Sequence, residues 1–86
     1  MPEISRFLGI VIAIYYNDHL PAHFHAKYGE RTGVFSIADL RLIEGRLPER
    51  VTSLVLEWAF AHRDDLMEDW ELAMARKPLR KIEPLV

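Results

Sequence analysis

Three of the four histidines of this 86-residue chain fall within a span of seven residues. His23, His25 and Lys27 alternate with apolar residues, a period of two that predicts a strand with these side chains on one face. Their β-carbons would then lie roughly 7 Å apart, so two imidazoles can approach one object. His19 belongs to the preceding turn and joins them only if the loop through Pro21 folds over. This segment is the predicted seat of function.

Acid–base catalysis is the first chemistry that this histidine set supports. His23 and His25 would act as acid and base, removing the proton of an RNA 2′-hydroxyl and protonating the leaving oxygen. His19 and Lys27 would support them, with Lys27 or Arg31 stabilising the charge of the phosphorane. Such a ribonuclease needs no metal and no organic cofactor.

Metal binding is the second possibility. His19, His23 and His25 offer three neutral nitrogens, a set that suits zinc or another divalent transition metal with an open fourth position. Asp18 and Glu30 are the nearby carboxylates that would orient the rings. In a third interpretation the histidines only form hydrogen bonds that fix a loop or a protein interface. The residues alone leave these three interpretations open.

Other residues have conditional roles in these interpretations. His62 continues an apolar helical stripe, so a core or helix-end position is expected for it. Tyr15 or Tyr16 would line the site, because neighbouring strand residues face opposite ways. Glu57 is expected to face solvent unless the histidine face of the sheet packs toward its helix.

Composition bounds the class of protein. Hydrophobic residues make up 50% and charged residues 28% of the chain, the balance of a folded domain, and the length predicts one domain over residues 1–86. Cysteine is absent, which favours a reducing, cytoplasmic location. The formal charge of -2 excludes a general basic field for nucleic acid, so RNA contacts would be local. The apolar run 9–16 is too short for a membrane span.

The first half of the chain, residues 1–45, reads as an antiparallel meander. Strands are expected over 10–16, 23–28, 32–37 and 40–43, with a fifth over 4–7. The trio Asn17, Asp18 and His19 before Leu20-Pro21 predicts the turn that reverses the chain.

Helical periodicity begins after Gly45. One apolar stripe covers 51–62 and a second covers 66–74, and Asp65 with Glu68 resembles a capping box, so we expect two helices with a break at 62–64. The alternative is one helix of nearly thirty residues. The fold class is therefore α+β: four to five strands, a helical hairpin over 46–77 packed on one face, and a tail over 78–86 that packs back or forms an edge strand.

The sequence resembles the small bacterial proteins grouped as domain of unknown function 4160. The resemblance covers nearly the whole chain, through PEISRFLGIVIAIYYNDHLPAHFHAKYGE and LVLEWAFAHRDDLMEDWELA. The hallmark of that family is a Pro-Pro-His-Phe-His core, matched here from Pro21 to His25 with Ala22 in place of the second proline. The positions similar to recurring ones in the helical half are Trp58, His62, Leu66 and Trp70.

The resemblance implies a genetic context more than a mechanism. Members have no settled biochemical activity, and they are typically encoded beside a small protein of the domain of unknown function 2442 type, in an arrangement like a type II toxin–antitoxin pair. By this analogy the chain would be the toxin-like member, inhibited by a small cognate antitoxin-like protein. The rival expectation is a non-enzymatic protein-binding module with a metal or structural histidine site, and a homodimer through exposed aromatic residues is a third.

Overall fold

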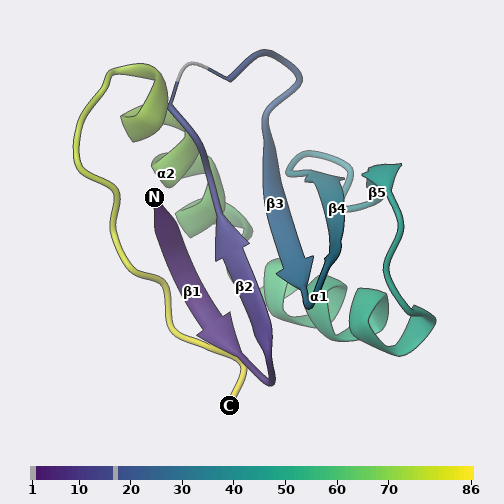
Figure 1. Ribbon diagram of the computed structural model, residues 1–86. Coiled ribbons are helices and arrows are strands. Elements are labelled where there is room, and N and C mark those ends of the chain that lie inside the picture. The colour runs from purple at the N-terminus through teal and green to yellow at the C-terminus, as the bar shows by residue number, and fades with distance from the viewer. Residues whose placement is uncertain (1, 17) are drawn as a thin grey trace.

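The computed structural model describes residues 2–16 and 18–86, so the predicted turn residue Asn17 lies outside the described part. Five antiparallel strands form one sheet in the order of the sequence, which confirms the five-stranded version of the meander (Figure 1). The strands are β1 (Glu3–Phe7), β2 (Ile10–Ala13), β3 (His23–Tyr28), β4 (Arg31–Ser36) and β5 (Leu42–Gly45).

Two helices, α1 (Glu49–Ala61) and α2 (Arg63–Met74), follow the sheet and lie behind it in Figure 1. The expected break is confirmed, because His62 has φ -125° and ψ 27° and separates the two helices. The predicted capping box is wrong. Helix α2 begins at Arg63, so Asp65 lies inside its first turn, and the residue before the helix makes no side-chain capping bond.

The face of the sheet toward the helices forms the core. Phe24 and Phe35 stack with ring centroids 5.3 Å apart, and Phe24 meets Trp58 of α1 edge-on at 6.1 Å. Trp58 is fully buried, and burying each such side chain contributes about 1.5–3 kcal/mol. Because β3 alternates, Phe24 and Ala26 point into this core, whereas His25 and Lys27 lie on the other side of the strand. His23, at the start of β3, is buried and its ring reaches Trp70 of α2.

The tail over 78–86 packs back along β1 and has no regular secondary structure. Of the two expectations for the tail, packing back is the one observed, and an edge strand is not formed. The backbone N–H of Ile82 donates to the carbonyl oxygen of Ile4 at 2.7 Å. The indole N–H of Trp58 donates to the carbonyl oxygen of Glu83 at 2.7 Å. The tail thus covers the β1 edge of the sheet. In the described part of the chain, no helix is long and apolar enough to cross a membrane.

The register across the sheet places one row of residues beside the histidines. His25 pairs with Ala13 of β2 and with Val34 of β4, and Val34 pairs with Glu44 of β5. Directly paired residues point to the same face of an antiparallel sheet. The row therefore lies on the same face of the sheet as the His25 side chain.

Candidate functional site

Asp18, in the loop between β2 and β3, joins the two strand histidines. Its Oδ2 lies 2.9 Å from Nε2 of His23 and 3.3 Å from Nε2 of His25. One nitrogen of each ring and one carboxylate oxygen lie within 4.8 Å of one another. Two imidazoles and a carboxylate therefore converge on one point, at the place that the spacing of the histidines indicated.

His23 is fixed from several directions. Its side chain is only 5% exposed, and its ring lies 5.1 Å from the ring of Trp70 in α2. Its Nδ1 lies 2.7 Å from the carbonyl oxygen of Pro21, which can only accept a hydrogen bond, so Nδ1 is the donor. With Asp18 at the other nitrogen, both ring nitrogens have partners within the protein.

His25 is the more accessible of the two strand histidines. Its side chain is 22% exposed, and its ring meets Tyr15 edge-on at 4.6 Å. Its Nε2 faces Asp18, whereas its Nδ1 has no hydrogen-bond partner among the residues that the structure describes. Tyr15 rather than Tyr16 thus borders the site, because the Tyr16 hydroxyl donates to the carbonyl oxygen of Lys77 at 3.1 Å.

His19 lies at the mouth of the site. It is exposed, its ring centroid is 5.7 Å from that of His23, and its Nδ1 donates to the carbonyl oxygen of Leu20 at 3.1 Å. The loop and the strands beside it line an open cavity of about 200 Å³, and His19 lies outside the group that Asp18, His23 and His25 form. This cavity, the histidine pocket, is lined by Asp18, His19, Pro21, His23, His25, Val34, Ile43 and Glu44.

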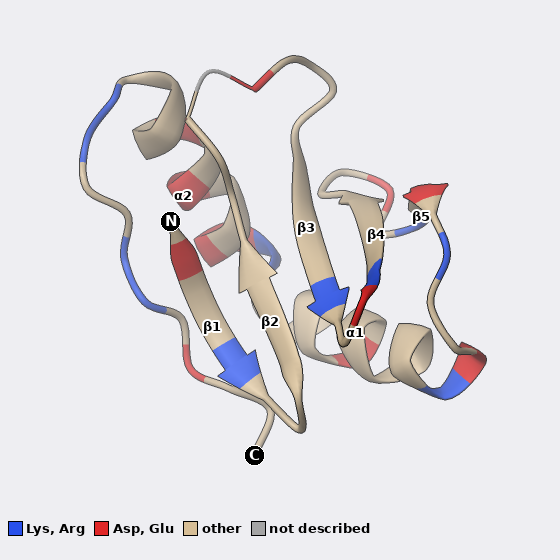
Figure 2. Ribbon diagram, viewed as in Figure 1, with Lys and Arg blue, Asp and Glu red and all other residues tan. Residues whose placement is uncertain are grey.

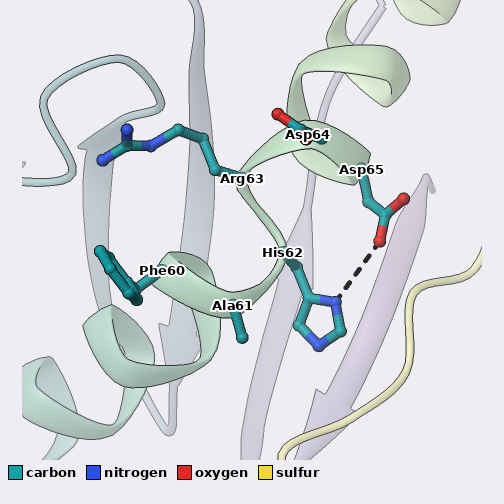
Figure 3. Close-up of a pocket in the computed structure, with 6 residues that line it drawn as sticks. All are labelled: Phe60, Ala61, His62, Arg63, Asp64 and Asp65. Atoms are coloured by element: carbon teal, nitrogen blue, oxygen red, sulfur yellow. Dashed lines mark hydrogen bonds and ion pairs between the residues drawn. The ribbon is translucent and has the colours of Figure 1, made fainter.

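Lys27 and His62 lie apart from the histidine pocket. Lys27 is exposed two residues farther along β3, between Val11 and Thr32, and does not line the cavity. His62 lies in another cavity, of about 450 Å³, at the junction of the helices, where Figure 3 shows it turned toward Asp65. Its Nδ1 is 3.4 Å from Oδ2 of Asp65, in agreement with the expected helix-end position.

The carboxylate of Asp18 is held in its charged form. Partial burial opposes ionisation, but the hydrogen bond from His25, the charge of His23 and the backbone N–H of His19 outweigh it and lower the pKa of Asp18 below its ordinary value of 3.8. Among described residues, the group with metal-binding geometry is Asp18, His23 and His25. From the sequence, Asp18 was expected only to orient the rings. The signal for a direct role was its place five residues before His23 and seven before His25.

This arrangement can do three things chemically. An imidazole whose N–H is held by a carboxylate can act as a base through its other nitrogen. Two imidazoles and a carboxylate can bind a divalent transition metal. The same hydrogen bonds also fasten the loop to β3.

A family model described as "Domain of unknown function (DUF4160)" matches residues 9–71, which include both strand histidines, Asp18 and most of the two helices. No curated protein matches the chain, and no solved structure does. The match covers more than half of the sequence and extends from β2 into α2. The chain therefore belongs to the domain of unknown function 4160 family.

Proposed function

We propose that this protein is the toxin-like member of a type II toxin–antitoxin pair and cleaves RNA at the histidine pocket. The observation that carries the proposal is the convergence of His23 and His25 on Asp18 beside an open cavity. A small cognate antitoxin-like protein would inhibit it by covering this pocket, and the site of action would be the cytoplasm. The genetic context implied by the family resemblance supports the assignment of partners.

His25 is the base in this mechanism. Asp18 accepts the N–H of its Nε2, which leaves the lone pair of Nδ1 to take the proton of a 2′-hydroxyl. The 2′-oxygen attacks the phosphorus, the bond to the 5′-oxygen breaks, and the products are a 2′,3′-cyclic phosphate and a 5′-hydroxyl. His19, exposed at the mouth of the pocket, protonates the leaving oxygen.

His23 and Lys27 have supporting roles. His23 is buried and bonded at both nitrogens, so it positions Asp18 instead of exchanging protons with substrate. Positive charge lies at the end of β3 and the start of β4, where Lys27 and Arg31 are (Figure 2). Lys27 shares the strand face of His25 and would attract the phosphate backbone locally, as a protein of net charge -2 requires, whereas Arg31 pairs with Tyr28 and points to the opposite face of the sheet.

Expression in a bacterial host with and without the neighbouring partner gene tests the proposal. The protein alone should slow growth, and the partner should restore it. His25→Ala should abolish toxicity, and also the cleavage of a short RNA by purified protein in the presence of a chelator. His62→Ala is the matched control, because His62 lies outside the histidine pocket, and it should stay toxic. Unimpaired growth, or a toxic His25→Ala variant, would contradict the mechanism.

A non-enzymatic binding module is the second candidate function. The observation that favours it is that both nitrogens of His23 fasten the loop, through Pro21 and Asp18, which is what a structural site needs. In this case the protein would bind its partner without cutting RNA, and His25→Ala would leave partner binding intact. Pull-down with the partner separates the two functions, and the mass in solution decides whether the free protein is a homodimer.

A further inference from the structure

The tautomer of His23 determines what the histidine pocket can bind. Nδ1 carries a hydrogen, because its partner is the carbonyl oxygen of Pro21 at 2.7 Å. In the neutral ring the lone pair therefore belongs to Nε2. Donation of the other ring N–H to a carbonyl is the usual arrangement for a histidine that ligates a metal.

Nε2 of His23 faces Oδ2 of Asp18 at 2.9 Å. An ionised carboxylate only accepts hydrogen bonds, so a neutral His23 would point one lone pair at another. A positive centre is needed between these two atoms, either a proton on the ring or a metal ion. His25 presents its Nε2 to the same oxygen at 3.3 Å and adds a second nitrogen to that point.

The two distances between Asp18 and the rings fit an ion with little movement, and one nitrogen of each ring lies within 4.8 Å of one nitrogen of the other. Zinc–nitrogen and zinc–oxygen bonds of about 2.0–2.2 Å place neighbouring ligand atoms of a tetrahedral site about 3.3 Å apart. The contact between His25 and Asp18 already has this length. The contact between His23 and Asp18 needs to widen by only a few tenths of an ångström.

The surroundings hold the ligands in place and leave one side open. The ring of Trp70 lies against His23, and Tyr15 meets His25 edge-on, so both imidazoles are held by packing as well as by hydrogen bonds. Three protein ligands leave a further coordination position, which would face the cavity of about 200 Å³. We infer that Asp18, His23 and His25 form a binding site for a divalent transition-metal ion.

The ligand set differs from the His19, His23 and His25 set considered from the sequence. The ligating nitrogens of His23 and His25 meet the carboxylate of Asp18, whereas exposed His19 lies outside the group of ligand atoms that are within 4.8 Å of one another. An ion on Nε2 of His25 would leave the ring proton on Nδ1. The metal-loaded pocket and the acid–base pocket are therefore alternative states of the same residues, and a bound ion would supply Lewis-acid chemistry.

Metal titration of untagged, chelator-treated protein tests the inference without any RNA. Calorimetry with Zn²⁺ should give one ion per chain, and Co²⁺ should give a visible spectrum that Zn²⁺ abolishes. His25→Ala and Asp18→Asn should each weaken binding by at least about tenfold. His62→Ala and His19→Ala should bind Zn²⁺ with the same affinity as the unmodified protein.

Three results would overturn the site. The first is that the unmodified protein binds Zn²⁺ no more tightly than His25→Ala does. The second is that Asp18→Asn keeps the affinity of the unmodified protein, and the third is that His19→Ala loses Zn²⁺ binding. Circular dichroism of each variant shows that it is folded, and His25 and Asp18 are partly exposed, so these variants avoid the packing defect expected at buried His23. RNA cleavage in chelator is measured separately, so failure of the metal site and failure of the proposed nuclease are distinguishable.

Discussion

Replacing Asp18 by asparagine tests whether this carboxylate fastens the loop between β2 and β3 to the sheet. The change keeps the size of the side chain and removes its charge. In the metal-free pocket, with a proton on both nitrogens of His23, Oδ2 of Asp18 accepts hydrogen bonds from His23 at 2.9 Å and from His25 at 3.3 Å, and Oδ1 accepts one from the backbone N–H of His19 at 3.2 Å. In Asp18→Asn the contacts with the rings lose the charge of the carboxylate. In one flip of the amide both rings face its N–H₂ group, and in the other flip the backbone N–H of His19 faces it.

The expected loss of stability follows from the two ring contacts. Hydrogen bonds to a charged group contribute about 1.5–3 kcal/mol and neutral ones about 0.5–1.5 kcal/mol, a difference of about 1 kcal/mol for each bond. The carboxylate is only 18% exposed, so solvent screening reduces this difference little. Asp18→Asn should therefore lower the free energy of unfolding by about 2 kcal/mol, or Tm by about 10 °C in a domain of this size.

Urea denaturation at pH 7 in the presence of a chelator measures this loss without any contribution from bound metal. Asp39→Asn is the matched control, because the Asp39 side chain is 63% exposed and its ion pair with Arg41 is long, at 3.9 Å. The control should change stability by less than about 0.5 kcal/mol. If Asp18→Asn is as stable as Asp39→Asn, the carboxylate does not hold the histidines and the structural argument for the pocket fails.

Three further predictions concern the scaffold. Burial raises the pKa of Asp69, whose Oδ2 has no hydrogen-bond partner among described residues. The folded state therefore holds the carboxyl proton of Asp69 more tightly than the unfolded state does. The free energy of unfolding should decline as pH rises from 3.8 through the pKa of the folded state. Asp69→Asn should abolish that decline in denaturation curves from pH 3 to 7, and parallel curves for the two proteins would refute it. Gly45→Ala should lower the free energy of unfolding by at least about 2 kcal/mol, because φ is +80° and a β-carbon would overlap a backbone carbonyl of β4. Gly29→Ala, at φ +61° with open space around it, should lower it by about 1 kcal/mol. Equal losses in thermal unfolding of the two variants would count against this packing of Gly45. Trp58→Phe removes the donor to the carbonyl oxygen of Glu83, so it should lower the free energy of unfolding by about 1–3 kcal/mol and speed proteolysis of the tail. An unchanged rate of tail cleavage would show that this hydrogen bond does not hold the tail.

The meander was predictable because its information is local. Alternation of polar and apolar residues over 23–28 identified β3 and its two faces, and the change to helical spacing after Gly45 located the helices. The break at His62 followed from two offset apolar stripes. The capping residues were missed, because which group bonds the first turn depends on backbone angles that the apolar pattern does not contain.

The sequence by itself determined that His23 and His25 share one face of a strand, because side chains two apart on a strand point the same way. Only the tertiary structure decided that His23 is buried against Trp70 and that Asp18, and not His19, meets both rings. Those contacts join a loop, a strand and a helix. Their geometry depends on the path of the loop and on packing between elements distant in the sequence, neither of which residue spacing specifies.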